Sequence, residues 1–460
     1  MSSSTDAIRE TKVRDYSKIV FVVMLLFFFA YGVFIARTLD GGIIPDEQAH
    51  FLFAKHYSNT LGIPLDTTET ITTGWNIAHN PFLFYWISGR VINFVQLVYP
   101  KVNDWQLLVI LRLVNLVFSL GSILFCYRIS KEVIKNKWYQ LLPSFLLINT
   151  LMFVFVASGV NYDNLAVLCS MGGLYFLLQA LIGNEFYTNS LAWMMCISFG
   201  TLVKFTILPL ALIMFIVWLI YTLKNRKSIF PLPMAGWKRL LMMVGLILLI
   251  GGNLAIYGYN LVTFKWILPN CNNILSDAQC ELNPYLKRYR EQALDHKLSV
   301  AESIDLGYPD PVEYVAYVWG PLMFDRTYGI AGHKVYYPAY ITCFQLLFAW
   351  GVLLAVRYWK RPTSNIINAT VISIAYALVL IVFNYNNELI YGFKNYGLTG
   401  RYLFPVIGLV YGLYGYTIEQ IRNKPIQIIT LLVTLALFLV GGPIEFLWHY
   451  NTVFSTWFIH

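Results

Sequence analysis

The chain has 460 residues, of which 58% are hydrophobic and only 12% are charged. With a mean hydropathy of +0.58 and many apolar runs near the ~20 residues that cross a bilayer, this composition excludes a soluble enzyme with a single anchor. It predicts an all-α polytopic membrane protein. The formal net charge of +9 would suggest nucleic acid or acidic lipid as the partner of a soluble protein. Here the charges fall on loops, so we expect membrane lipid as a partner and no nucleic acid.

The first apolar run, from Ile19 to about Ala36, follows four basic residues at positions 9–18. A signal peptide has the same charge order, but this run is longer than a usual h-region and no clear small-x-small cleavage site follows it. We therefore expect a retained helix and a cytoplasmic N-terminus.

The next apolar stretch, Pro81–Tyr99, is long enough to span but contains Arg90. Counting it as a span would place the basic cluster at 128–137 outside, against the positive-inside rule. An arginine at the bilayer midplane would also cost ~2.5–3.5 kcal/mol. We therefore expect an interfacial helix within one exoplasmic loop, residues 40–104.

These choices predict about eleven transmembrane helices, with exoplasmic juxtamembrane helices and an exoplasmic C-terminus. After the first helix, the expected spans lie near 105–127, 141–159, 165–183, 189–203, 206–222, 240–263, 340–356, 365–384, 402–420 and 427–446. The apolar stretch 189–222 is divided at Lys204, because Lys224, Arg226 and Lys227 then lie inside.

Two exoplasmic loops are long, 40–104 and about 264–339, and long ordered loops are usually functional. We expect a single membrane domain over residues 1–460, since no repeat or soluble terminal domain is visible. Cys271 and Cys280 share the second loop, where an oxidising exterior would allow a disulfide, and the sequence leaves that pairing open.

Polar residues follow the first apolar run at once, in the sequence GGIIPDEQAHF at 41–51. Charge this close to hydrocarbon usually has a function. The alternative is a plain helix start, with Pro45 at the first helical position and Asp46 and Glu47 in the first turn. The two interpretations are compatible, because a helix on the membrane surface can hold a carboxylate at its N-terminal end.

The predicted topology brings eleven polar residues to one side of the membrane. They are Asp46, Glu47, His50, His79, Asn161, Asp163, Lys204, Arg326, Glu388, Lys394 and Arg401. Five of them have a simpler explanation: a turn for Asp163, snorkelling for Lys204, an interfacial anchor for Arg401, and backbone hydrogen bonds for His50 and His79.

Five ordered motifs resemble a bacterial membrane-protein family of unassigned function. They are PDEQAHF at 45–51, HNPFLFY at 79–85, NYDNLA at 161–166, LVKFT at 202–206 and GRYLFP at 400–405. That family is similar to the GT-C superfamily of polyprenyl-phosphate-sugar-dependent glycosyltransferases, which includes protein mannosyltransferases and the aminoarabinose transferase of lipid A. The second long loop and the C-terminal tail are not covered by the resemblance.

The resemblance implies that Asp46 is the first-loop acid that serves as catalytic base or acceptor ligand. It implies that Asp163 is the acid of the next exoplasmic turn and that Lys204 contacts the lipid phosphate. His79 is followed by Asn80 where some relatives have proline, which leaves its role open. The superfamily varies in metal use, so a divalent metal is neither required nor excluded.

Residue chemistry favours the same reaction. A polyprenyl-phosphate donor needs a base near the acceptor hydroxyl and cations on the leaving phosphate. We expect Asp46, Glu47 and Asp163 as catalytic candidates, Lys204, Arg401 and Arg326 on the donor phosphate, and His50, His79, Asn161 and Tyr402 on the substrate. Asp46 and Glu47 should point about 100° apart on a helix, so only one faces the reacting atom, and we favour Asp46.

The predicted function is therefore glycosyl transfer to a hydroxyl of an envelope glycan or lipid, at the exoplasmic face of a bacterial inner or plasma membrane. A transporter or flippase of lipid-linked glycans is the alternative class. It should place polar residues or helix breaks near the midplane and show internal repeats, whereas here the charged residues gather at one face and no repeat is visible. A glycan polymerase that uses a lipid-linked donor also stays open.

Overall fold

The computed structural model describes residues 16–74, 76–226, 236–332, 334–338, 340–392, 397–448 and 455–458. Within these ranges regular structure is almost entirely helical, apart from an antiparallel pair of short strands, β1 (Ile330–Ala331) and β2 (Val335–Tyr336). The predicted all-α fold is confirmed. Lys394, Lys227 and the basic residues at 9–14 lie outside the described ranges.

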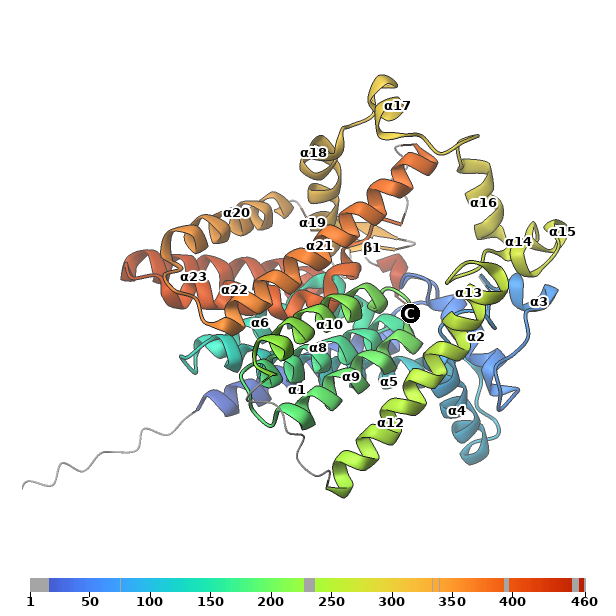
Figure 1. The fold of residues 1–460 in the computed structure, drawn as a ribbon, viewed down its shortest axis with the longest axis horizontal. Helices are drawn as coiled ribbons and strands as arrows, with labels where there is room; N and C mark the ends of the chain where they lie inside the picture. The colour runs from blue at the N-terminus through green and yellow to red at the C-terminus, as the bar shows by residue number, and fades with distance from the viewer. Residues whose placement is uncertain are drawn as a thin grey trace, which may run out of the picture.

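Long helices pack side by side into a bundle (Figure 1). They are α1 (Ser17–Thr38), α5 (Asp104–Val133), α8 (Tyr162–Leu181), α9 (Phe186–Val203), α10 (Ile207–Lys224), α12 (Trp237–Asn253) continued by η2 (Leu254–Gly258) and α13 (Tyr259–Phe264), α20 (Ile341–Tyr358), α21 (Ser364–Tyr391), α22 (Phe404–Gln420) and α23 (Lys424–Leu439). Shorter helices complete it: η1 (Tyr139–Leu141), α6 (Leu142–Ile148), α7 (Leu151–Ala157), η4 (Gly400–Leu403), η5 (Val440–Ile444), α24 (Glu445–Trp448) and η6 (Ser455–Trp457). α8 lies at the centre, with 83% of its apolar window buried.

Eight helices in the described part of the chain are long and apolar enough to cross a membrane. A ninth is added if η1–α6 and α7, which are bent by 65°, count as one span. The two other predicted spans correspond to α9 and α22, which form helices at the expected places but are shorter or less apolar. A multi-pass membrane protein is therefore confirmed, while the count of about eleven spans stays a prediction.

The predicted division of the 189–222 stretch is confirmed. α9 ends at Val203, Lys204 has an extended backbone (φ −151°, ψ 130°), and α10 begins at Ile207. Pro209 explains the break, because its ring is tolerated in the first turn of α10 but would clash inside a helix continued from α9. Lys204 is thereby held between two helix ends.

The first long loop folds into α2 (Glu47–Ser58), α3 (Thr68–Ile71) and α4 (Leu83–Val98). α4 has 16 residues and packs on α2. Gly89 permits this close approach, since a Cβ there would lie 2.8 Å from the Tyr57 carbonyl carbon. Arg90 donates hydrogen bonds to the carbonyls of Tyr57 and Thr60. It therefore caps the end of α2 and is not directed into hydrocarbon.

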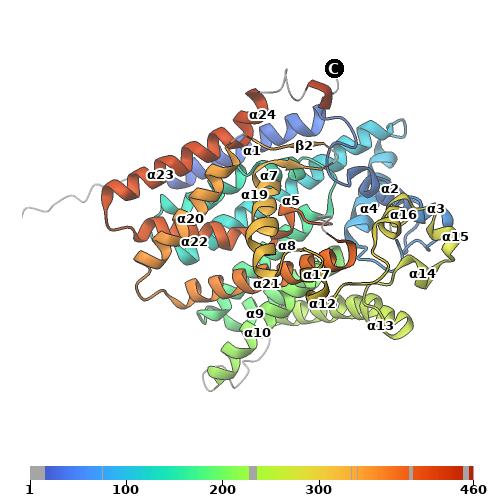
Figure 2. The same ribbon diagram turned by 90° about the horizontal axis from the view of Figure 1, so that it is seen from above.

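The second long loop contains α14 (Cys271–Ile274), α15 (Asp277–Cys280), α16 (Pro284–Gln292), α17 (Val300–Asp305), α18 (Pro311–Glu313), η3 (Tyr314–Trp319) and α19 (Gly320–Tyr328). Cys271 and Cys280 form a disulfide. Figure 2, like Figure 1, shows α2–α4 and α14–α16 gathered at one end of the bundle, which we call the loop end.

This arrangement predicts from which side of the membrane four exposed positions can be labelled. Cysteines placed at Lys101 and Asp305 should react with a membrane-impermeant maleimide from one side, and those at Lys135 and Arg226 from the other. The parent chain should carry Cys343→Ser, because Cys343 is exposed. Labelling of position 101 from the cytoplasmic side would mean that α4 spans the membrane, and labelling of positions 101 and 135 from the same side would mean that α5 does not.

Candidate active site

Asp46 lies at the loop end, immediately before α2. Its backbone is left-handed (φ 59°), which aspartate tolerates better than most residues. The helix starts at Glu47, so Pro45 is outside it and not at its first position as expected. The Asp46 side chain makes no capping hydrogen bond. Its Oδ2 instead accepts a hydrogen bond from Nη2 of Arg401 at 2.5 Å.

Two carboxylates and two cations converge at this point. Arg401, in η4, also approaches Asp163 with its Nε 3.5 Å from Oδ2. Asp163, in the first turn of α8, forms an ion pair with Lys204. The side chains are 33% exposed for Asp46, 10% for Arg401, 7% for Lys204 and 4% for Asp163. Asp46 is thus the member of this cluster, which we call the charge cluster, that is open to an incoming molecule.

Lys204 lies between two aromatic rings. Its Nζ is 4.6 Å from the ring centre of Tyr162 and 4.7 Å from that of Tyr402. Burial lowers the pKa of Lys204, and the charge of Asp163 opposes that shift. The aromatic faces add cation–π attraction, which favours the charged ammonium. Tyr402, expected to bind substrate, thus flanks Lys204.

Glu47 points away from the charge cluster and into the protein. It forms a bidentate ion pair with Arg112 of α5, with Nε–Oε1 at 2.8 Å and Nη2–Oε2 at 2.6 Å. Neither side chain has exposed surface. Asp46 and Glu47 therefore diverge as expected, but Glu47 is placed in the core and not among the groups that face a substrate.

Two further predicted residues, Asn161 and His50, are buried near the charge cluster and do not face a substrate. Asn161 is buried and caps α8, because its Oδ1 accepts from the Asp163 amide at 2.9 Å while its Nδ2 donates to the Pro45 carbonyl at 3.1 Å. His50 has no exposed surface, and its Nδ1 is 2.8 Å from the Tyr85 hydroxyl. Burial lowers the pKa of His50 to about 4, although the charge of Asp46 opposes this. His50 is therefore neutral at pH 7 and presents no surface to a substrate.

Arg326, on α19, lies next to the loop that carries Arg401. It donates a hydrogen bond to the Leu398 carbonyl, while its Nε has no hydrogen-bond partner among the described residues. Only glycine fits at position 400, since a Cβ there would lie 2.6 Å from the Thr327 amide nitrogen. This close packing places Arg326 against one end of the segment 398–401, at Leu398, while Arg401 is at its other end.

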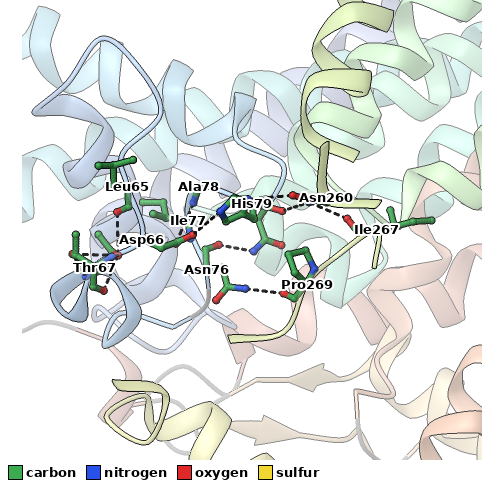
Figure 3. A network of polar contacts seen from close by, with 12 residues as sticks. Leu65, Asp66, Thr67, Asn76, Ile77, Ala78, His79, Asn260, Ile267 and Pro269 are labelled. Atoms are coloured by element: carbon green, nitrogen blue, oxygen red, sulfur yellow. Dashed lines mark hydrogen bonds and ion pairs between the residues drawn. The ribbon is translucent and has the colours of Figure 1, made fainter. Parts of the chain in front are cut away.

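His79 lies in a different network, shown in Figure 3. Its Nδ1 is 3.1 Å from Oδ1 of Asn260, and its Nε2 is 3.7 Å from Oδ2 of Asp66. It stacks on Tyr259, with ring centres 6.0 Å apart. The structure therefore does not bring His79 into the charge cluster, with which the topology had grouped it.

An apolar cavity of about 420 Å³ opens among α19, α20, α21, α22 and α23. Thr327, the residue after Arg326, and Leu403, two residues after Arg401, line one end, and Trp359 and Thr417 line the other. The residues of α20 that line it run from Phe344 to Ala355, about 17 Å along a helix axis. The cavity is thus long, apolar and adjacent to Arg326 and Arg401.

The sequence analysis missed Arg112, although an arginine inside the predicted span 105–127 is a rare signal that could have found it. Tyr162 and Tyr85 carry no such signal, because aromatic residues are common throughout this chain.

Among the described residues, no group of three or more His, Cys, Asp and Glu side chains is placed to hold a metal ion. The fold and the site together define a multi-pass α-helical membrane protein with paired charges at one end.

No family model matches the chain, and no curated protein is similar to it. Several solved structures are similar in fold. One is ArnT from Cupriavidus metallidurans bound to undecaprenyl phosphate, with 14% identity and a TM-score of 0.47, covering 93% of this chain and 65% of that one. The archaeal oligosaccharyltransferase AglB from Archaeoglobus fulgidus, in complex with an inhibitory peptide and a dolichol-phosphate, has 12% identity and a TM-score of 0.47, covering 94% and 56%.

A third is arabinosyltransferase EmbB from Mycobacterium smegmatis, with 10% identity and a TM-score of 0.44, covering 90% of this chain and 31% of that one. All three are GT-C glycosyltransferases, the superfamily that the sequence motifs resemble. This chain spans less than two thirds of the length of each.

The Glu47–Arg112 pair predicts a large loss of stability when one partner is removed. Glu47→Gln should lower the free energy of unfolding by about 3–5 kcal/mol, because it leaves a buried guanidinium without its counter-charge. Denaturant unfolding in detergent would measure this. As a control, Lys55→Gln breaks the exposed pair with Asp104 and should cost less than about 1 kcal/mol. Equal losses in the two variants would contradict the assignment.

Proposed function

We propose that this chain is an integral-membrane glycosyltransferase that moves a sugar from a polyprenyl-phosphate-linked donor to a hydroxyl of an envelope glycan or lipid on the exoplasmic face. One observation carries the proposal: a cluster of paired charges with a partly exposed carboxylate lies two residues along the chain, at Arg401, from Leu403 in the wall of a long apolar cavity. A donor with a charged head group and an apolar tail requires these two environments side by side.

The cations of the charge cluster suit the phosphate. Nη1 of Arg401 is buried and has no hydrogen-bond partner among the described residues, while Nε faces Asp163 Oδ2 at 3.5 Å, so this guanidinium has a donor left for a further anion. Lys204 supplies a point charge, and Arg326 a third cation from α19. Because Arg401 and Lys204 are paired with carboxylates, the phosphate has to compete with Asp46 and Asp163 for them.

That competition gives Asp46 its role. As Arg401 turns to the phosphate, Asp46 is released from its ion pair and becomes a stronger base. The acceptor oxygen then attacks the anomeric carbon, the bond from that carbon to the phosphate oxygen breaks, and the polyprenyl phosphate leaves with the electron pair. Asp46 takes the proton of the acceptor hydroxyl, which is worth ~10²–10⁴ in rate. Asp163 keeps Lys204 in place, and we assign Glu47 a structural role.

The cavity suits the first part of the lipid tail. Its lining is formed mostly by aromatic and aliphatic side chains such as Phe344, Leu347 and Phe438. A tail that comes from the lipid phase can gain close packing contacts there, each worth ~0.1–0.2 kcal/mol per pair of atoms. A flippase would move the same donor without breaking its glycosidic bond. Release of polyprenyl phosphate during turnover therefore distinguishes the two classes, and a polymerase would share this product.

Asp46→Asn tests the base. It keeps the shape and hydrogen bonding of the side chain but removes its basicity, so transfer in proteoliposomes should fall at least ~100-fold. Binding of polyprenyl phosphate should not weaken, because Arg401 loses a competing carboxylate. Asp40→Asn, an exposed carboxylate just upstream, is the matched control and should keep wild-type turnover. Near wild-type transfer by Asp46→Asn would move the role of base to Asp163.

Ala377→Trp tests the cavity. Ala377 lines it from α21, and a bulky ring there should remove the packing contacts of two or three methylenes of the tail, ~0.1–0.2 kcal/mol for each pair of atoms, and weaken binding of a long-chain polyprenyl phosphate about tenfold. A short-chain analogue, measured by the same calorimetric titration, should be affected much less. Val382→Trp adds the same ring on the outer face of α21, where Val382 is 68% exposed. If both variants bind the long chain equally well, the tail lies elsewhere.

A further inference from the structure

The network around His79 contains a histidine and a carboxylate that the proposed function does not use. Asp66, between α2 and α3, has a side chain that is 3% exposed. Its Oδ1 accepts hydrogen bonds from the amides of Ile77 at 2.6 Å and Ala78 at 3.2 Å. Its Oδ2 has no hydrogen-bond partner in the described chain and faces His79 Nε2 at 3.7 Å (Figure 3). The Asp66 carboxylate thus accepts hydrogen bonds from the two residues before His79 with one oxygen and faces the His79 ring with the other.

Asn260 determines which nitrogen of His79 carries a hydrogen. Its Nδ2 donates to the carbonyls of His79 at 2.9 Å and Ile267 at 3.0 Å, which fixes the orientation of the amide. Its Oδ1 can only accept, and it is 3.1 Å from His79 Nδ1. Nδ1 is therefore the protonated nitrogen. In a neutral ring, Nε2 would then point a lone pair at the carboxylate of Asp66.

Two acceptors facing each other inside a protein are unfavourable unless a proton lies between them. We infer that Asp66 and His79 share one proton and form a pH-dependent latch within the first long loop, which holds His79 in place for its contacts with Asn260 of α13. With the proton bound, the pair is an imidazolium facing a carboxylate, or an imidazole accepting from a carboxyl group. Without the proton, a buried negative charge faces a lone pair, and the latch is weakened.

The side chains around Asp66 and His79 do not change charge near neutral pH, so the pH dependence comes from this pair. The other titratable side chains that face it are Tyr57 of α2, whose pKa burial and the charge of Asp66 raise, and Tyr259, which stacks on the ring. Neither phenol brings a formal charge at neutral pH. Asn76, which donates to the Pro269 carbonyl at 2.8 Å, also joins the two loops but does not titrate. The latch therefore modulates the contact between the loops without being its only support.

The direction of the pH effect follows from proton linkage. Burial raises the pKa of Asp66, with the two backbone amides and the charge of His79 opposing the shift. A group whose pKa is raised in the closed state holds its proton longer there than in the open state. The stability that the latch adds is thus present at low pH and is lost as the pH rises through the raised value. In the open state, where the carboxylate and the imidazole are apart, neither group holds this proton above about pH 6.5.

Hydrogen exchange of the segment 66–80 tests the latch in the full-length protein in detergent. After correction for intrinsic rates, its protection should fall as the pH rises above about 6.5, by at most about tenfold per pH unit. Asp66→Asn should remove this dependence and keep the segment protected throughout. Its oxygen can still accept from Ile77 and Ala78, while its amide group donates to Nε2 at any pH.

Two variants complete the design. Asp310→Asn changes a carboxylate that also accepts from two backbone amides, those of Val312 and Glu313, and it should keep the wild-type pH dependence. His79→Phe keeps an aromatic ring but removes both nitrogens, so it should show low protection at every pH. Protection in the wild type that does not change with pH, or an unaltered pH dependence in Asp66→Asn or His79→Phe, would overturn the proposal. The measurement needs no substrate, so its outcome is independent of the proposed transferase activity.

Discussion

The buried pair of Glu47 and Arg112 is the constraint on which the geometry of the candidate site depends. The same guanidinium donates to the carbonyls of Ala36, Leu39 and Asp40, and Glu47 Oε1 also accepts from the Val160 amide at 3.0 Å. The pair thus joins the end of α1, the start of α2, the middle of α5 and the segment before α8. Two charges without exposed surface are stable only in good mutual geometry, so these four segments cannot move independently.

This constraint places the neighbouring carboxylate. Asp46 precedes Glu47 by one residue, and its left-handed backbone turns its side chain away from the core toward Arg401. Asn161 extends the same scaffold, because it joins Pro45 to the first turn of α8, where Asp163 lies. Adjacent acids therefore have opposite surroundings, one in a dry ion pair and the other at the edge of solvent. Only the second is suited to exchange its partner for a ligand.

The charge cluster also explains how four ionised groups are tolerated at a largely buried position. Two carboxylates and two cations compensate one another, and the rings of Tyr162 and Tyr402 hold the ammonium of Lys204. An incoming phosphate adds negative charge to this balanced set, so it enters by displacing a carboxylate and not by filling a vacant positive site. The adjacent cavity lets an apolar tail remain out of water while this exchange occurs.

The sequence by itself determined the helical class, the positions of most long helices, the break at Lys204 and the meeting of Asp46, Asp163, Lys204 and Arg401 at one end. These follow from hydropathy, proline placement and the distribution of charge, which act along the chain. Only the tertiary structure decided that Glu47 pairs with Arg112, that His79 joins Asp66 and Asn260 outside the charge cluster, and that a cavity opens beside Arg326. Those outcomes depend on helix phase and on contacts between residues far apart in sequence. Asp46 is partly exposed and Glu47 is buried because Asp46 has a left-handed backbone and lies outside the helix that begins at Glu47.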